Sequence, residues 1–232
     1  MTLHRIARML GLCAVAIALF FGLMPAAFAD DAAGTGTAVL TLEAPLLDGA
    51  PTDVYKTYFL RVRRRDNGKE YQFRYWAHAW AESSPNDLAA TGGTGTVFTQ
   101  ALDAGDWEVF LFQIDTTGSA IRWRPAQEFS IPFTIHAGRA AYIGDFRPLG
   151  QNFKGSLGDY PGGVRFVVAD RSARDIPLAT AKTPGLGPVD VGVFNVDTMH
   201  NPLFSSTDAF AAPYDQSQFC RYMNLIACAP NL

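Results

Sequence analysis

Two runs of alternating side chains separated by Asp66-Asn67-Gly68 constrain the fold of this chain more than any other feature. In the first run, residues 58–63, apolar side chains on one face alternate with arginines on the other. The second run, residues 71–75, repeats the alternation with Tyr71, Phe73 and Tyr75. Asn and Gly both tolerate the positive φ angles of a tight hairpin turn. The sequence therefore predicts a β-hairpin with one buried face.

Further short apolar runs continue this pattern along the chain and are separated by turn residues. Such spacing is typical of a β-sandwich, so we expect a mainly β fold, an antiparallel sandwich of about nine strands. The sandwich core is placed at residues 37–170 and is completed by residues 171–232. Its further expected strands are 39–43, 97–102, 107–114, 129–135, 139–146, 164–169 and 189–196. Pro132 predicts an edge strand or a bulge, because proline has no N–H to donate.

The expected strand from Trp107 to Ile114 is apolar on both faces. One sheet covers only one face, so a second cover is needed. The C-terminal segment is the favoured cover, because its apolar residues recur at helical spacing; a second protein chain is the alternative. These residues are Phe219, Tyr222, Met223 and Ile226.

A short helix is expected between residues 170 and 184. If Asp175 is its N-cap, Pro177 falls in the first turn, where a missing N–H is tolerated. Pro184 would end it. In this interpretation Asp170 and Asp175 serve turn and cap chemistry rather than catalysis.

Two turn motifs carry a resemblance to a known family. An aromatic residue stands two positions after a turn glycine in the motif Leu102-x-x-Gly105-x-Trp107-x-Val109. A second motif, which also combines a turn glycine with aromatic residues, runs from Phe133 to Gly144. Together they resemble transthyretin-like or carboxypeptidase-regulatory-like β-sandwiches of exported bacterial proteins of unknown function, over roughly residues 37–147. The resemblance implies a sandwich and carries over no catalytic residue.

The first 29 residues have the order of an export signal. Arg5 and Arg8 precede an apolar block, residues 10–23, and Ala27 and Ala29 stand at the recognition positions before Asp30. The block is about 14 residues long, whereas a membrane anchor needs about 20. We expect cleavage before Asp30, a flexible start over 30–36, no transmembrane span in the mature chain, and a periplasmic or alternatively extracellular location.

After cleavage two cysteines remain, Cys220 and Cys228. An even pair in an oxidising compartment predicts a disulfide, with two free thiols as the alternative. The whole chain has 19 basic and 22 acidic residues. Loss of two arginines leaves 17 against 22, a net charge of −5, which argues against a nucleic-acid partner.

No motif for catalysis or for a cofactor is found. Ser156 lies between glycines but lacks the spacing of a nucleophile elbow. The histidines of the mature chain, His78, His136 and His200, form no His-x-His motif. Asp197 and His200 lie three residues apart, which supplies two ligands and not a metal site. We expect no metal and no cofactor.

An arginine-rich face is the strongest candidate for a binding site. Arginines gather on the hairpin of an otherwise acidic chain and share its outward face with aromatic residues. One interpretation is a solvated face that protects an edge strand; the other is a patch for an anionic ligand or for lipid head groups. The candidate residues are Phe59, Arg61, Arg63, Arg65, Arg74 and Trp76.

These observations together predict an exported, non-catalytic β-sandwich that serves as a binding, scaffold or envelope-associated module. Its partner would be an envelope protein or an anionic ligand. The alternatives are a hydrolase whose site has no legible motif, and a binder of anionic lipid through the arginine-rich hairpin.

Overall fold

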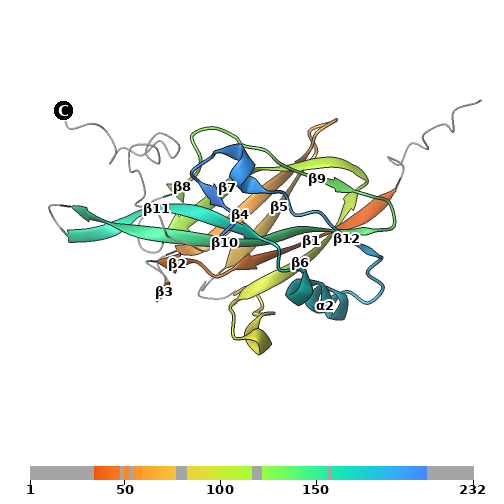
Figure 1. Ribbon diagram of the computed structural model, residues 1–232, viewed down its shortest axis with the longest axis horizontal. Helices are drawn as coiled ribbons and strands as arrows, with labels where there is room; N and C mark the ends of the chain where they lie inside the picture. Colours follow the sequence, from red (N-terminus) through yellow and green to blue (C-terminus); the bar gives the residue numbers. More distant parts are fainter. Residues whose placement is uncertain are drawn as a thin grey trace, which may run out of the picture. The chain divides into compact units, whose positions relative to one another are not determined.

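The computed structural model describes residues 34–47, 50–52, 55–76, 83–116, 122–155 and 158–207. They form two β-sheets, one α-helix and two short 3-10 helices (Figure 1). The expected signal segment, the cysteine pair, the C-terminal apolar segment, His78 and Ser156 all lie outside the described residues. Within the described ranges no helix has the length and apolar character needed to cross a membrane.

The larger sheet, called sheet A, has eight strands in the order β13-β11-β10-β1-β6, with β12 and β2 also paired to β10 and β3 paired to β2. It is a mixed sheet, because β1 runs parallel to β10 and β12 also runs parallel to β10. The expected mainly β sandwich is confirmed, but its antiparallel pairing holds for sheet B and only part of sheet A, where β10 pairs antiparallel with β11 and parallel with β1. Alternation in a sequence carries no information on strand direction. The strands are β1 (Thr35–Glu43), β2 (Leu46–Leu47), β3 (Ala50–Pro51), β6 (Gly95–Asp103), β10 (Ala140–Gly155), β11 (Gly158–Ala169), β12 (Val189–Val191) and β13 (Phe204–Ser205).

The smaller sheet, called sheet B, is antiparallel, with the order β5-β4-β7-β8 and with β9 also paired to β7. The expected hairpin is confirmed as β4 and β5, and Gly68 in its turn has φ 72°. Pro132 lies in β9, which pairs only with β7 among the described strands, so its edge position is confirmed. The strands are β4 (Tyr55–Arg64), β5 (Glu70–Trp76), β7 (Gly105–Thr116), β8 (Arg122–Trp123) and β9 (Ile131–Ile135).

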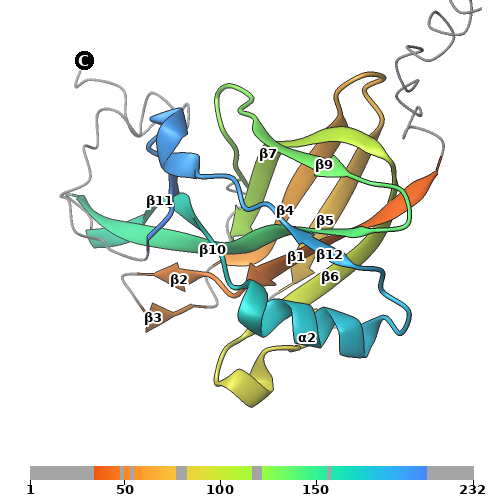
Figure 2. The same ribbon diagram turned by 45° about the vertical axis from the view of Figure 1, so that its right-hand side comes forward.

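The main core lies between the inner faces of the two sheets, as expected for a β-sandwich. It is rich in aromatic rings: the centroids of Phe112 and Phe166 lie 4.7 Å apart, and those of Phe129 and Phe204 lie 4.6 Å apart. A second, smaller cluster lies between sheet A and the helix α2 (Ser172–Lys182) and includes Val39, Tyr142 and Ala179. Figure 2 shows α2 on one side of sheet A and the strands of sheet B on the other.

A β-bulge in β7 accounts for much of the doubly apolar pattern of the expected strand, while the C-terminal segment predicted to cover its second face lies outside the described residues, so that prediction is not tested. Arg61 pairs with Leu111 but Val62 pairs with Val109, so Phe110 is an extra residue. A bulge reverses the alternation after it. The apolar residues before it, Trp107 and Val109, and those after it, Phe112 and Ile114, therefore all face the same core.

The helix α2 begins earlier than expected. It starts at Ser172 after Arg171, and Pro177 lies inside it. The carboxylate of Asp175 is bound to Tyr142 and Arg174, so it is not free to cap the helix. Pro177 is exposed. Two further corrections concern short elements: the strand expected over 189–196 ends at Val191, and 3-10 helices occupy Ala89–Thr91 (η1) and Val196–Met199 (η2).

Candidate functional site

The outer face of sheet B brings together most of the predicted patch. In the β4–β5 hairpin Phe59 lies opposite Arg74, Arg61 lies opposite Gln72, and Trp76 lies one pair further along, opposite Thr57. Side chains two positions apart on one strand share a face, so these residues are neighbours. We call this group the arginine–aromatic face; its members are Phe59, Arg61, Gln72, Arg74 and Trp76.

The arginines of this face are stacked on its aromatic rings. The guanidinium carbon of Arg74 lies 5.8 Å from the centroid of Phe59 and 5.1 Å from that of Trp76. The guanidinium carbon of Arg61 lies 5.6 Å from the centroid of Phe59. These distances are within the range of cation–π attraction. Phe59 is 6 % exposed although it lies on the outer face of the hairpin.

Acidic side chains neutralise the two arginines of this face only weakly. Arg61 lies 3.7 Å from Glu70, and both side chains are more than 40 % exposed, so this ion pair is weak. Among the described residues Arg74 has no ion pair within 4 Å. Its Nε and Nη2 atoms lie 3.0 and 2.9 Å from the side-chain amide of Gln72, which accepts both hydrogen bonds when its oxygen faces Arg74.

Arg63 has a different role from the one predicted. Its guanidinium group donates to Glu108 at 2.7 Å and to Glu128 at 3.1 Å, and it lies 4.4 Å above the Phe110 ring. The hydrogen bond to Glu108 raises the pKa of Arg63. Burial alone would raise the pKa of Glu108, but hydrogen bonds from Ser130 and Arg63 outweigh it and lower this pKa. Arg63 is thus an internally neutralised cation that covers the bulge residue.

Arg65 also falls outside the face. It follows the last residue of β4, and its backbone N–H donates to the carbonyl of Asp106 at 2.9 Å. Its neighbour Arg64 points inward, where its side chain is 9 % exposed and lies 3.0 Å from Asp66. The six predicted residues therefore divide into four on the arginine–aromatic face and two, Arg63 and Arg65, with local structural contacts.

A buried network of charged side chains at the junction of β1, β10 and α2 was not foreseen from the sequence. Arg174 contacts three carboxylates: Glu43 at 2.5 Å, Asp145 at 3.1 Å and Asp175 at 2.6 Å. Arg147 binds the second oxygen of Glu43. Tyr142 donates to Asp175 at 2.6 Å.

The carboxyl groups of Glu43 and Asp145 titrate very differently. Burial and the charge of Glu43 raise the pKa of Asp145 well above its usual range. Burial would also raise the pKa of Glu43, but hydrogen bonds from Asp145 and Arg174 outweigh it and lower this pKa. Asp145 Oδ1 has no donor partner in the described structure, which disfavours an ionised Asp145. The network joins α2 to sheet A through Arg174, which contacts Glu43 of β1 and Asp145 of β10.

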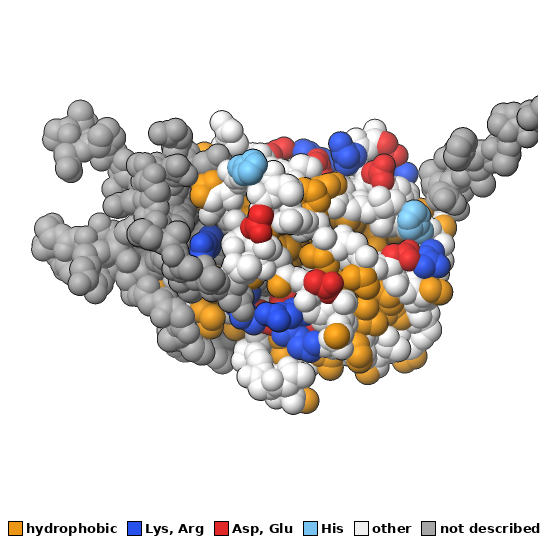
Figure 3. All heavy atoms as spheres, in the orientation of Figure 1, with side chains coloured by type: hydrophobic (Ala, Val, Ile, Leu, Met, Phe, Trp, Pro, Cys, Tyr) orange, Lys and Arg blue, Asp and Glu red, His pale blue; other side chains and the backbone are white. Residues whose placement is uncertain are grey.

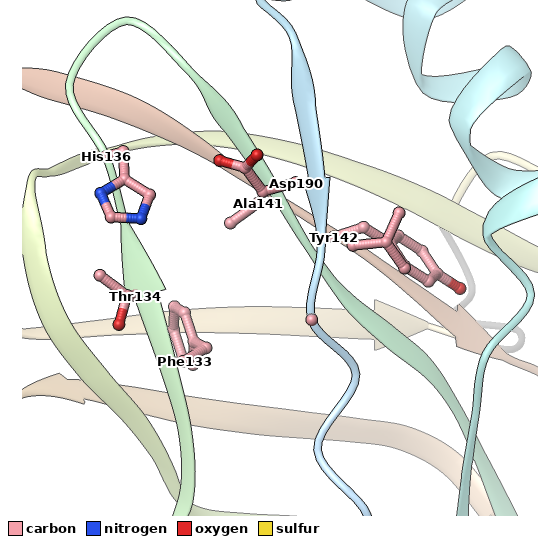
Figure 4. Close-up of a pocket in the computed structure, with 8 residues that line it drawn as sticks. Phe133, Thr134, His136, Ala141, Tyr142 and Asp190 are labelled. Atoms are coloured by element: carbon pink, nitrogen blue, oxygen red, sulfur yellow. The ribbon is translucent and has the colours of Figure 1, made fainter.

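A shallow cavity of about 290 Å³ lies between β9, β10 and β12. Figure 4 shows His136 and Asp190 on its upper side, with Phe133 and Thr134 below His136 and the Tyr142 ring pointing away from them. The hydroxyl of Thr134 donates to Asp106 at 2.8 Å. Asp190 is held by Arg139, whose Nε lies 2.7 Å from it. The polar groups that line this cavity are thus already engaged, His136 excepted.

The remaining predicted residues do not form a site. Asp197 accepts hydrogen bonds from the backbone N–H and the hydroxyl of Ser206, and His200 donates its backbone N–H to the carbonyl of Asp197. In the described ranges no group of three or more His, Cys, Asp or Glu side chains is placed to hold a metal ion. On the face drawn in Figure 3, acidic and basic side chains are interspersed, and hydrophobic side chains gather at the right.

Comparisons with known proteins add little to this description. No family model matches the chain, and no curated protein matches it. A leucine-rich repeat protein from Bacteroides thetaiotaomicron is 12 % identical over 48 % of this chain and 13 % of its own, with a TM-score of 0.28. A candidate cell-adhesion protein from Parabacteroides distasonis is 15 % identical over 58 % of this chain and 41 % of its own, with a TM-score of 0.30. The chain thus spans less than half the length of either structure.

Proposed function

We propose that this protein is an exported, non-catalytic β-sandwich module that binds an anionic ligand through the arginine–aromatic face. The observation that carries the proposal is Arg74, a cation stacked on Phe59 and Trp76 with no acidic partner among the described residues. Stacking restricts the guanidinium group before a ligand arrives, so less conformational entropy is lost on binding.

Electrostatic attraction supports the same conclusion. Arg61 and Arg74 are diagonal neighbours on adjacent strands, and both guanidinium groups lie within 6 Å of the Phe59 ring centroid. Among the described residues their charges are weakly compensated by one acid, Glu70, whereas Arg63 has two acidic partners, Glu108 and Glu128. A hydrogen bond from a charged donor to an anion is stronger than one from a neutral donor. Two arginines on one rigid sheet therefore favour the binding of an anion.

Export to the bacterial envelope, most simply to the periplasm, follows from the signal pattern of residues 1–29. A hydrolase would use the cavity beside His136. Among the described residues, however, the His136 ring makes no hydrogen bond to a hydroxyl, thiol or carboxylate that would make it a general base. A binding role is therefore the better supported function.

The proposal is tested by equilibrium binding of the mature protein to phosphatidylglycerol vesicles and to polygalacturonate at 25 and at 250 mM salt. We expect binding that falls with salt and is lost in the variant Arg61→Gln/Arg74→Gln. The matched control is Arg124→Gln/Arg139→Gln, which removes the same charge elsewhere and should bind as the parent does. Equal binding by the two double variants, or no binding of either probe by the parent at low salt, would refute the proposal.

A further inference from the structure

The free edge of the Arg74 guanidinium group defines which anion fits the arginine–aromatic face. A guanidinium group offers two donor pairs that match a carboxylate in its own plane, one of Nε with Nη2 and one of Nη1 with Nη2. Gln72 occupies the first pair, at 3.0 and 2.9 Å. The second pair is left for a ligand, because Arg74 has no ion pair in the described part of the chain and its side chain is exposed.

The local charge balance points to a singly charged group. In the described structure Arg61 and Arg74 have one acidic partner between them, Glu70, whereas the single charge of Arg63 is shared by two carboxylates, those of Glu108 and Glu128. Arg61, Arg74 and Glu70 together carry one net positive charge, which a single carboxylate would balance, and a carboxylate can accept from both free donors of Arg74 in the plane of the guanidinium group.

The neighbouring aromatic residue indicates what carries the carboxylate. Trp76 is partly exposed beside Arg74, one residue pair from the end of the hairpin. A partly exposed indole beside a charged group can stack on the apolar face of a ligand ring. The outer face of a sheet is open, so it can bind an extended molecule more readily than a ligand that needs a deep pocket.

We infer that the ligand is an acidic polysaccharide, whose ring carboxylate pairs with the Nη1 and Nη2 atoms of Arg74 while the adjoining sugar ring lies on Trp76. Arg61, the diagonal neighbour of Arg74, is placed to take the carboxylate of a neighbouring sugar unit. This inference rests on the proposed function and narrows its ligand to carboxylated rings, in preference to lipid head groups.

Calorimetric titration with tetragalacturonate tests the inference, with its methyl ester and a neutral galactose tetramer as matched probes. We expect tetragalacturonate to bind, and the ester and the neutral tetramer to bind at least about tenfold more weakly. Arg74→Lys keeps the charge but loses the paired donors, so it should also weaken binding about tenfold or more. Trp76→Leu should weaken binding and abolish any ligand-induced change in the fluorescence assigned to Trp76.

The outcomes separate this inference from the proposed function. Equal affinity for tetragalacturonate and its methyl ester, or unchanged affinity in Arg74→Lys, overturns the carboxylate pairing. If phosphatidylglycerol vesicles bind in a manner that needs Arg61 and Arg74 while tetragalacturonate does not bind, the face is a lipid-binding surface: the proposed function stands and the polysaccharide inference fails. If neither probe depends on these two arginines, both fail.

Discussion

Replacing Arg174 by methionine is the most severe single test of the buried network. Arg174 contacts all three carboxylates, of Glu43, Asp145 and Asp175, and these are 6 %, 3 % and 0 % exposed. Its removal leaves Glu43 with Arg147 and Asp175 with the Tyr142 hydroxyl. Methionine fills a similar volume, so the main effect is the loss of charge compensation.

Breaking a buried ion pair by removing one partner typically costs about 3–5 kcal/mol. For a domain of this size that corresponds to a fall in melting temperature of about 6–20 °C. The assay is urea unfolding at pH 7 followed by circular dichroism, with Lys182→Met as the matched control. Lys182 lies on the same helix but pairs with Asp87 near the surface, so its loss should cost about 1 kcal/mol or less.

The pH dependence provides a second readout of the same variant. Without Arg174 the buried carboxyl groups have raised pKa values, so the folded state binds more protons than the unfolded state above pH 4. Stability then falls as pH rises, and the deficit of Arg174→Met should be smaller at pH 4.5 than at pH 7. A deficit equal to that of Lys182→Met, or one that does not change with pH, would refute this account of the network.

Three further predictions concern single sites. Asp145→Asn should cost less stability relative to the parent at high pH than at low pH. The raised pKa of Asp145 makes the stability of the parent fall as pH rises above about 4. A difference in urea midpoint between variant and parent that is the same at pH 5 and at pH 8 would contradict this. Gly105→Ala should lower the free energy of unfolding by about 1–3 kcal/mol. The φ angle of Gly105 is 141°, and a Cβ there would lie 3.0 Å from the Arg64 guanidinium group. An unchanged urea midpoint would show that the strand adjusts without cost and would contradict this prediction. Cys220 and Cys228 should be joined in the exported protein, and mass spectrometry that finds two free thiols would disprove the bridge.

The parts of the fold that the sequence predicts well are those determined by neighbouring residues. The β4–β5 hairpin depends on Asn67-Gly68 and on the alternation beside it, and its register then places Phe59 opposite Arg74. The arginine–aromatic face was predictable for the same reason. The parallel pairing of β1 with β10 was not, because it joins Thr37 to Ala140 and leaves no local signature.

The bulge and the buried network show the two limits of sequence reasoning here. A strand with apolar residues at consecutive positions fits two covered faces as well as one face interrupted by a bulge, and only the register around Phe110 separates them. The network joins Glu43 to Arg174, 131 positions away. The internal neutralisation of Arg63 by Glu108 and Glu128 is likewise set by distant strands, so the sequence overstated the number of cations available to a ligand.

The central claim is that an anion binds on the outer face of sheet B, and a two-dimensional NMR titration of the isotope-labelled mature protein tests it most directly. The probe is tetragalacturonate, followed by glycerol phosphate as a lipid head-group analogue. The account predicts that shifts concentrate at Phe59, Arg61, Gln72 and Arg74 and at the indole N–H of Trp76. Shifts confined to the cavity of His136 and Asp190, with the hairpin resonances unmoved, would contradict it.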